Sequence, residues 1–133
     1  LRVVAHVRNR AAAFLLTFPS MNGIIQLGNC KERRCSKMLS RREVEQAIRS
    51  LLGKYHADYA ILFGSYARNS ANANSDIDVV LVGGAHFRAR DVFAFGEELR
   101  ELTCKDVDAF ELREINRESD FYRTVMREGV RIA

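Results

Sequence analysis

Residues 77–82 form an apolar, largely β-branched run, Ile-Asp-Val-Val-Leu-Val, which limits the possible folds more than any other segment does. A run dominated by such residues is typical of a strand buried inside a sheet. Gly83 and Gly84 follow it, and paired glycines end strands. A chain of 133 residues can bury one modest core. We therefore expect one domain built around this strand, with an extension.

Alternating helical and extended patterns continue on both sides of this run. Ser40 and Glu43 have the spacing of a helix-capping box, apolar residues then recur at helical spacing, and Gly53 suits the helix end. The other predicted elements are strands at 59–63, 77–82 and 105–112, helices at 90–102 and 118–128, and a short edge strand at 130–133. The predicted order is α-β-β-α-β-α, followed by the edge strand.

The same patterns predict which side chains lie in the core and which lie at the surface. The apolar positions of the helix at 90–102 are Val92, Phe93, Phe95, Leu99 and Leu102. We expect these residues to face inward or lie in the core: Phe87, Phe93, Phe95, Phe121, Val125 and Met126. Tyr66 is expected to serve packing, and Lys105 to be a surface charge.

Charge divides the chain into two unlike parts. Residues 1–42 carry nine Lys or Arg and a single acid, whereas residues 43–133 carry 12 basic and 16 acidic residues. The pI of about 9.2 therefore belongs to the N-terminal part. Phosphate contacts dominate nucleic-acid binding, so the mildly acidic body argues against a nucleic-acid substrate.

Residues 1–37 are expected to be an N-terminal extension, and residues 38–133 to be the domain. The apolar run at 11–18 resembles a signal peptide only faintly, because it is short and no cleavage site of small residues follows. It could instead pack on a partner as a helix. The simplest hypothesis is a poorly ordered segment, or sequence translated from upstream of the natural start at Met38, with Met21 as the weaker alternative start.

The three cysteines, Cys30, Cys35 and Cys104, cannot all pair with one another. An odd count without regular spacing indicates free thiols in a reducing compartment. No second Cys/His pair stands at zinc-finger spacing from Cys30 and Cys35. We therefore expect a cytoplasmic protein that has no membrane partner.

The strongest chemical signal lies between the first two predicted strands. Gly64 and Ser65 follow a strand, where glycine lets the backbone approach a phosphate and Ser65 adds a hydroxyl and an N–H donor. Arg68 adds positive charge, or is a solvated arginine. Asp76 and Asp78 open the next strand two residues apart, so both carboxylates point to one face. Paired carboxylates repel unless a cation lies between them.

A third carboxylate is expected from the strand at 105–112. Asp108 is favoured because Val107 and Ala109 flank it on the opposite face, whereas Asp106 lies nearer the strand start. Hard oxygen ligands at this density suit Mg²⁺ that also contacts phosphates. Such an array, with one or two metal ions, supports in-line displacement at phosphorus.

These residues resemble the signature of the polymerase-β-like nucleotidyltransferase superfamily: Gly64-Ser65, then Asp76-x-Asp78 at a strand, then a distant Asp108. The small size and the stretch at 75–78, Ser-Asp-Ile-Asp, look like the minimal nucleotidyltransferases, which are typically antitoxins encoded beside a HEPN-type ribonuclease toxin. The resemblance covers roughly residues 40–133. It departs at Asn69, where many relatives have glycine, but Asn also tolerates left-handed backbone, so we expect the turn to be kept.

The resemblance implies an α/β (α+β) nucleotidyltransferase fold, a small mixed β-sheet flanked by helices. It implies ATP as the nucleotide donor, Mg²⁺ (one or two ions) held by the catalytic residues Asp76, Asp78 and Asp108, and nucleotide contacts from Gly64, Ser65 and Arg68. AMP would pass to a tyrosine hydroxyl of a HEPN-type toxin partner in a hetero-oligomer.

Two alternatives remain open at this stage. The first is a non-catalytic antitoxin that neutralises its toxin by covering it. The second is a small-molecule transferase of the aminoglycoside-modifying kind, which usually needs a second domain for its acceptor. Fold alone does not decide among these functions.

Overall fold

The computed structural model describes residues 5–7 and 38–133 of the chain. The elements in chain order are β1 (Ala5–Val7), α1 (Arg41–Leu52), β2 (Ala57–Phe63), α2 (Gly64–Ala67), β3 (Ile77–Gly83), α3 (Ala89–Thr103), β4 (Val107–Glu111), a 3₁₀ turn (Leu112–Glu114), α4 (Asp120–Glu128) and β5 (Val130–Ile132). The helices and strands predicted after residue 38 are confirmed, with ends that differ by one or two residues.

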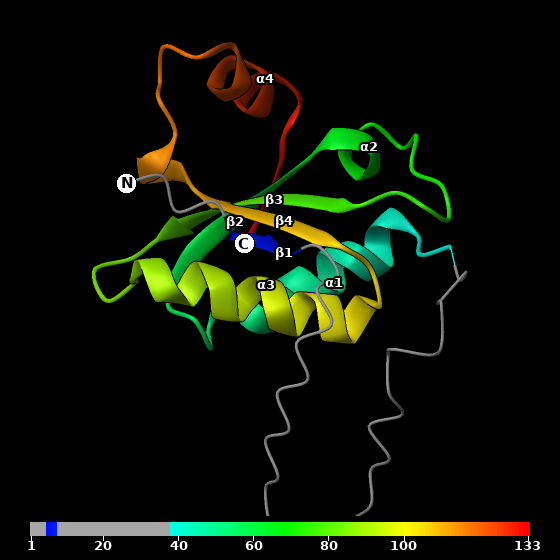
Figure 1. Ribbon diagram of the computed structural model, residues 1–133, viewed down its shortest axis with the longest axis horizontal. Coiled ribbons are helices and arrows are strands. Elements are labelled where there is room, and N and C mark those ends of the chain that lie inside the picture. Colours follow the sequence, from blue (N-terminus) through cyan, green and yellow to red (C-terminus); the bar gives the residue numbers. More distant parts are fainter. Residues whose placement is uncertain (1–4, 8–37) are drawn as a thin grey trace, which may run out of the picture.

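The strands form one mixed sheet in the order β1-β4-β3-β2-β5 (Figure 1). β3 and β4 are parallel, and the other neighbouring pairs are antiparallel. A parallel pair requires a crossover connection, which α3 provides. The small mixed sheet with flanking helices, as the resemblance implies, is confirmed.

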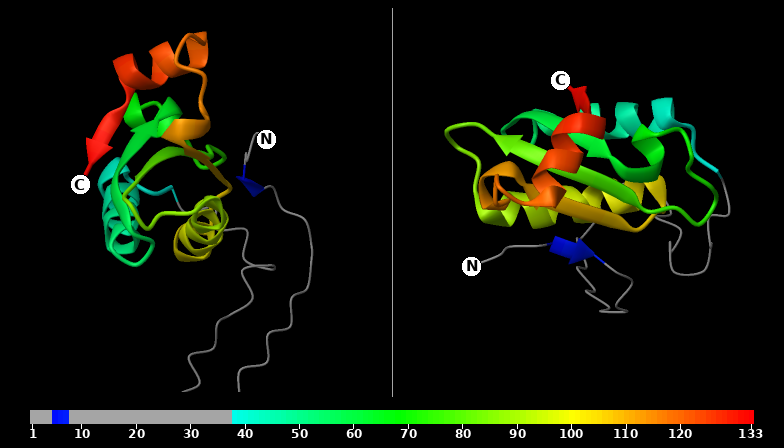
Figure 2. Two further views of the ribbon diagram at one scale, coloured as in Figure 1. Left: turned by 90° about the vertical axis from the view of Figure 1, so that its left-hand side faces the viewer. Right: turned by 90° about the horizontal axis from the view of Figure 1, so that it is seen from above.

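The helices cover the two faces of the sheet unequally. α1 and α3 lie on one face, whereas α2 and α4 lie on the other (Figures 1 and 2). The larger core lies between the sheet and α1 and α3, and it includes Ile48, Leu62 and Phe95. A smaller cluster of Ile61, Val80 and other apolar residues lies on the face of α4. Side chains that alternate along each strand therefore reach two different environments.

The first helix begins where its sequence predicts. The Ser40 hydroxyl accepts a hydrogen bond from the Glu43 backbone N–H at 3.2 Å, and the Glu43 carboxylate accepts one from the Ser40 backbone N–H at 2.7 Å. This reciprocal capping box satisfies two donors that the first turn leaves without helical partners. The apolar residues Val44, Ile48 and Leu51 then face the larger core.

Residues 5–7, inside the N-terminal extension, form β1 at the edge of the sheet, antiparallel to β4. The expectations for the rest of residues 1–37, including the cysteines at 30 and 35, concern segments outside the described residues. Within the described part of the chain, no helix has both the length and the apolar character that crossing a membrane requires.

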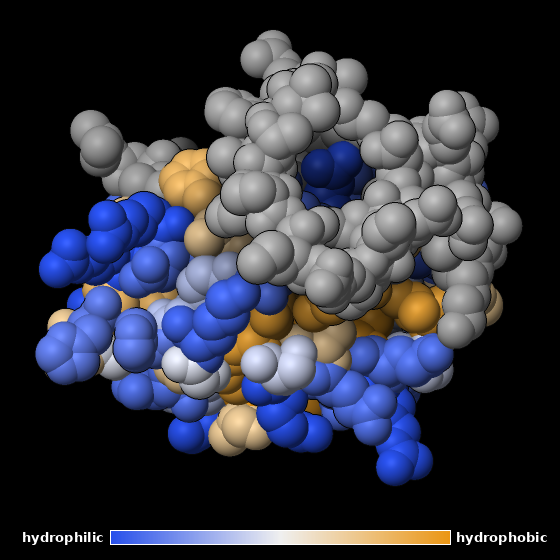
Figure 3. All heavy atoms as spheres, turned by 90° about the horizontal axis from the view of Figure 1, so that it is seen from below, coloured by the Kyte–Doolittle hydropathy of each residue, from blue (hydrophilic) through white to orange (hydrophobic). Residues whose placement is uncertain are grey.

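Three residues predicted to face inward, Phe93, Phe121 and Met126, are exposed instead. Phe93 on α3 is 45% exposed and the apolar Leu102 is 56% exposed, whereas Val92, Phe95 and Leu99 on the same helix are buried. Phe121 and Met126 on α4 are 38% and 52% exposed. Helical spacing marks the apolar stripe but not its width, which the neighbouring elements set. Figure 3 shows apolar surface between hydrophilic side chains on the face formed by α1 and α3.

A cluster of three aromatic rings attaches α4 to the sheet. The Phe121 ring lies 5.4 Å from the ring of Phe63 on β2 and 5.2 Å from that of Phe110 on β4, centroid to centroid. Phe63 and Phe110 are themselves 6.1 Å apart. Such edge-to-face and tilted contacts add to the free energy gained by burial. Phe121 thus spans β3 and holds the start of α4 over this face.

Replacement of Phe121 tests this attachment. We expect Phe121→Ala to lower the free energy of unfolding by about 2 kcal/mol, because it removes both ring contacts. Phe93→Ala is the matched control, since Phe93 is similarly exposed and has no ring partner among the described residues; it should cost less than about 0.5 kcal/mol. Urea denaturation measures both values. Equal losses would show that α4 is held by other contacts.

Candidate active site: an aspartate row beside a glycine turn

Two aspartates lie side by side on the parallel strands. Asp78 on β3 is the register partner of Asp108 on β4, so their side chains leave the same face of the sheet. Asp76 precedes Asp78 by two residues and lies immediately before β3, and its negative charge acts on Asp78. Asp78 and Asp108 point to the face of the sheet that carries α2 and α4. Val80 and Phe110, two residues further along β3 and β4, share that face and belong to the apolar cluster under α4.

The carboxylates affect one another electrostatically. The pKa of Asp78 is raised from 3.8 to about 6, first by burial and then by the negative charges of Asp108 and Asp76. The positive charge of Arg68 acts in the opposite direction. A carboxyl that is partly buried among like charges favours its neutral form unless a cation offsets them. These three residues, Asp76, Asp78 and Asp108, are called the aspartate row, and the row has the electrostatic character of a cation site.

The donor set fits a hard divalent cation, because carboxylate oxygens are the ligands that Mg²⁺ prefers. Among residues 5–7 and 38–133, however, no three His, Cys, Asp or Glu side chains converge closely enough to form a metal cluster. The residue types therefore fit a hard cation, whereas the described side chains do not form a closed set of three ligands.

Asp106 is placed differently from Asp108. Its carboxylate is 3.9 Å from the Arg100 guanidinium on α3, which covers the opposite face, and its side chain is 44% exposed. Its charge is also absent from those that raise the pKa of Asp78. The structure therefore brings Asp108, rather than Asp106, beside Asp78.

Gly64 makes the closest approach to the aspartate row. Its φ is +70°, in the left-handed region, and a Cβ atom at this position would lie 2.3 Å from Asp78 Oδ2. Only glycine combines this backbone with this proximity. The turn is closed on its other side by Ser65, whose carbonyl accepts a hydrogen bond from the Ser70 backbone N–H at 2.9 Å. Asn69 adopts φ 56°, so the left-handed turn expected there is confirmed.

Tyr66 is 1% exposed and packs in the larger core, as predicted. Its hydroxyl has no hydrogen-bond partner among the described residues. Burial, aided by the charge of Glu43, raises the pKa of this phenol. Tyr66 therefore anchors α2 beneath the turn and does not present its hydroxyl to the aspartate row.

Lys105 is a correction to the sequence analysis, which predicted a surface charge. It is 5% exposed, and its ammonium group donates a hydrogen bond to the Ala73 carbonyl in the loop between α2 and β3. The Ile77 backbone N–H also donates to the Asp106 carbonyl at 2.9 Å. These contacts fasten the loop that leads to Asp76 against the start of β4. The burial of Lys105 could not be predicted from the sequence of charges, because it depends on a backbone carbonyl 32 residues away.

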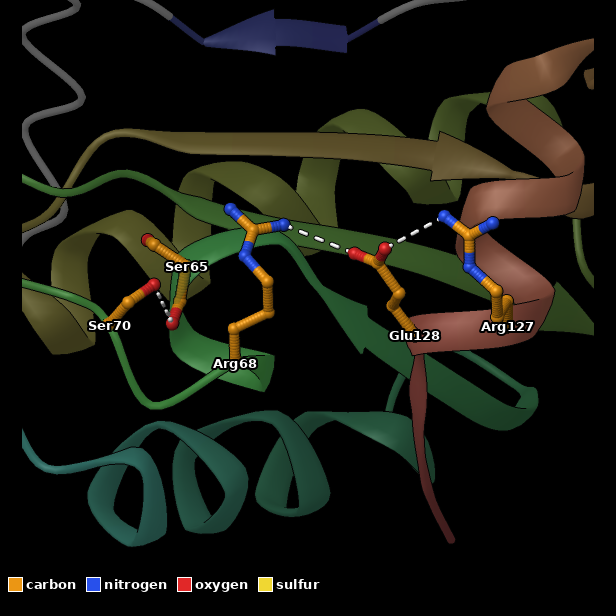
Figure 4. A network of polar contacts seen from close by, with 5 residues as sticks. All are labelled: Ser65, Arg68, Ser70, Arg127 and Glu128. Carbon is orange, nitrogen blue, oxygen red and sulfur yellow. Dashed lines mark hydrogen bonds and ion pairs between the residues drawn. The ribbon is translucent and has the colours of Figure 1, made fainter.

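Arg68 lies at the end of α2 and reaches toward α4. Its guanidinium is 3.2 Å from a carboxylate oxygen of Glu128, and the other carboxylate oxygen is 2.9 Å from the guanidinium of Arg127 (Figure 4). The sequence analysis singled out Arg68 but missed Glu128 and Arg127. The contact joins residues 60 positions apart, which spacing rules within one element do not detect.

A mixed sheet with a glycine turn beside an aspartate row defines a nucleotidyl-transferring class of fold, and the comparisons agree. The polymerase beta nucleotidyltransferase family model matches residues 46–133, and the chain belongs to this family. The protein is therefore a nucleotidyltransferase, as the sequence resemblance implied.

Individual relatives resemble parts of the chain. The "Putative protein adenylyltransferase MJ0435" of Methanocaldococcus jannaschii is 34% identical over 74 residues, which are 56% of this chain and 80% of that protein. A solved "Structure of putative minimal nucleotidyltransferase" superposes with a TM-score of 0.60 at 24% identity, over 71% of this chain and 97% of that one.

A chain from the solved complex of a tri-AMPylated Shewanella oneidensis HEPN toxin with an MNT antitoxin has a TM-score of 0.55 at 21% identity, over 70% of this chain and 71% of that one. At such identities the two structures establish a shared fold.

Replacement of Gly64 tests the close approach. We expect Gly64→Ala to lower nucleotidyl transfer by about 10- to 100-fold, because the new Cβ would displace the Asp78 carboxylate. The left-handed backbone adds a cost of about 1–2 kcal/mol. Gly53→Ala is the matched control, since a Cβ there meets nothing within 4 Å and its φ is −65°. Initial rates and thermal unfolding are measured for both variants. An active Gly64→Ala would contradict this account.

The raised pKa of Asp78 predicts that its ionised carboxylate destabilises the folded protein at neutral pH. Because the folded state keeps a proton that the unfolded chain releases, this group favours folding below about pH 4 and loses that contribution as the pH rises to about 6. In chelator at pH 7.5, we expect Asp78→Asn to be more stable than the wild type by about 1 kcal/mol, after allowance for solvent screening. Urea denaturation at pH 7.5 and pH 4 measures the difference, which should shrink at the lower pH.

Proposed function

We propose that this nucleotidyltransferase transfers AMP from ATP to a tyrosine hydroxyl of a HEPN-type toxin and so acts as its antitoxin. The observation that carries the proposal is the aspartate row beside Gly64, with Asp78 and Asp108 in register on one face. The relative named a protein adenylyltransferase and the fold shared with a chain from a complex that holds an AMPylated HEPN toxin support the choice of donor and acceptor.

Asp76, Asp78 and Asp108 would hold one or two Mg²⁺ ions, and the pKa of Asp78 agrees with this role. A bound divalent cation supplies positive charge that offsets both the carboxylates and the triphosphate, and it activates the attacking hydroxyl. Gly64 and Ser65 would admit the phosphates close to the backbone. Arg68 adds positive charge beside the row.

The proposed reaction is an in-line displacement at the α-phosphorus. The tyrosine oxygen forms a bond to that phosphorus, the bond from the α-phosphorus to the bridging oxygen of the β-phosphate breaks, and pyrophosphate leaves. The hydroxyl proton is released, so the products are the AMP ester and pyrophosphate. Positioning and charge neutralisation provide most of the acceleration in such transfers.

A second candidate is an antitoxin that acts by covering its toxin without transferring AMP. The partly exposed Phe121 and Met126 on α4 favour it, because exposed apolar side chains are common in the cores of protein interfaces. The two candidates differ in whether the aspartates are needed. Under the covering hypothesis, a chain with Asp76→Asn and Asp78→Asn still protects cells from the toxin.

Transfer of label is the direct test. We expect the HEPN-type toxin that this protein is proposed to modify to gain label from ATP labelled at the α-phosphate, with a mass increase of one AMP group per modified tyrosine. Asp78→Asn should lower the rate by about 100-fold or more, because it removes a metal ligand. Asp106→Asn is the matched control, since this aspartate pairs with Arg100 on the opposite face, and it should keep most of the activity.

Two results would contradict the proposal. The first is an unlabelled toxin in the presence of MgATP that the protein binds normally. The second is equal activity of wild type and Asp78→Asn, which would remove the aspartate row from the reaction. Labelling that persists after removal of divalent cations with a chelator would reject the metal requirement alone.

A further inference from the structure

The contact between α2 and α4 is a carboxylate held between two guanidinium groups. One oxygen of Glu128 is 3.2 Å from Arg68, and its other oxygen is 2.9 Å from Arg127 (Figure 4). Both arginines lower the pKa of Glu128 through hydrogen bonds and charge. Two guanidinium groups that converge on one anion are also the arrangement that binds phosphate oxygens.

This arginine pair adjoins the aspartate row. Arg68 ends the turn that begins at Gly64, and its positive charge reaches Asp78 strongly enough to affect the pKa of that carboxyl. Arg127 belongs to α4, which lies over the same face of the sheet (Figure 1). A chain of phosphates that passed from Asp78 along the glycine turn would therefore meet Arg68 and Arg127 next.

Glu128 is an unusual residue for its place in α4. It is the last residue of the helix, where the partial negative charge of the helix end disfavours a carboxylate. Its side chain is 28% exposed, and those of Arg68 and Arg127 are 53% and 72% exposed. Exposed ion pairs contribute little to stability, so a stronger anion can displace Glu128 at little cost. A triphosphate carries more negative charge than one carboxylate.

We propose that Arg68 and Arg127 together form a binding subsite for the β- and γ-phosphates of the nucleotide, and that Glu128 competes with the triphosphate for these two guanidinium groups. The inference rests on the proposed function, because it places the α-phosphate at the aspartate row. It adds Arg127 as a nucleotide-binding residue and assigns Glu128 a role in lowering nucleotide affinity. α4 thereby becomes part of the nucleotide site.

The competition gives the variants effects of opposite sign. We expect Glu128→Gln to tighten binding of MgATP and of inorganic tripolyphosphate by about three- to tenfold, because it removes the competing charge. Arg127→Ala should weaken both by a similar factor. Binding of AMP should not change in either variant, because AMP lacks the two terminal phosphates. Isothermal titration calorimetry of the full chain measures all three ligands.

Matched controls come from the same helix. Asp120 and Arg123 form an exposed pair of the same chemistry on α4, with 3.0 Å between Arg123 and Asp120. Asp120→Asn and Arg123→Ala change the net charge as Glu128→Gln and Arg127→Ala do, and we expect them to leave the three affinities unchanged. Equal effects of the two pairs would mean that net charge alone sets affinity, which would overturn the inference.

A purely structural role of Glu128 predicts a different result. If the carboxylate only fastened α4 to α2, Glu128→Gln would weaken tripolyphosphate binding instead of tightening it, and that result would reject the competition. Unchanged affinity in Arg127→Ala would remove Arg127 from the subsite. If the wild type transfers AMP but the affinities do not follow the predicted order, this inference alone fails. If the affinities follow it but no AMP is transferred, only the proposed reaction fails.

Discussion

The pairing of β3 with β4, in a register that sets Asp78 beside Asp108, is the contact on which the rest of the site depends. It brings together carboxylates from strands that are separated along the chain by a whole helix. It also explains why Gly64 lacks a side chain, since the Asp78 carboxylate fills the space that a Cβ would need. The buried Lys105, fastened to the loop before Asp76, holds the third carboxylate near the same end of the sheet.

α4 lies over the same face of the sheet as α2, so both helices border the aspartate row. Phe121 attaches the start of α4 to β2 and β4, while Glu128 connects its end to α2. The partly buried position of Asp78 has a physical cost, because a carboxylate among like charges is less stable than one in water. The fold thus accepts an electrostatic cost at Asp78, and perturbed carboxyl groups of this kind mark candidate functional sites.

Local rules predicted most of the fold, and non-local contacts account for what they missed. The capping box at Ser40, the strands and the Asp76-x-Asp78 spacing depend on neighbours within a few residues, so they can be read from the sequence. The exposure of Phe93 depends on how far the neighbouring elements cover α3, and the burial of Lys105 depends on a carbonyl 32 residues away. Arg127 and Glu128 likewise acquire their role only through a helix that returns over the sheet.

The strand order also means that the aspartates come together through two strand pairings, β2 with β3 and β3 with β4, that close loops of different length. β2 and β3 are antiparallel neighbours joined by the segment at 64–76, whereas β3 and β4 are joined only after the longer crossover at 84–106. Closing a longer loop costs more entropy, and parallel pairing across a crossover is slow for this reason. A partly folded chain can therefore contain the β2–β3 ribbon, with Gly64 already against Asp78, before Asp108 arrives. A chain in which β3 and β4 have not yet paired lacks the Asp78–Asp108 neighbours, so the same pairing that completes the sheet also completes the row of carboxylates.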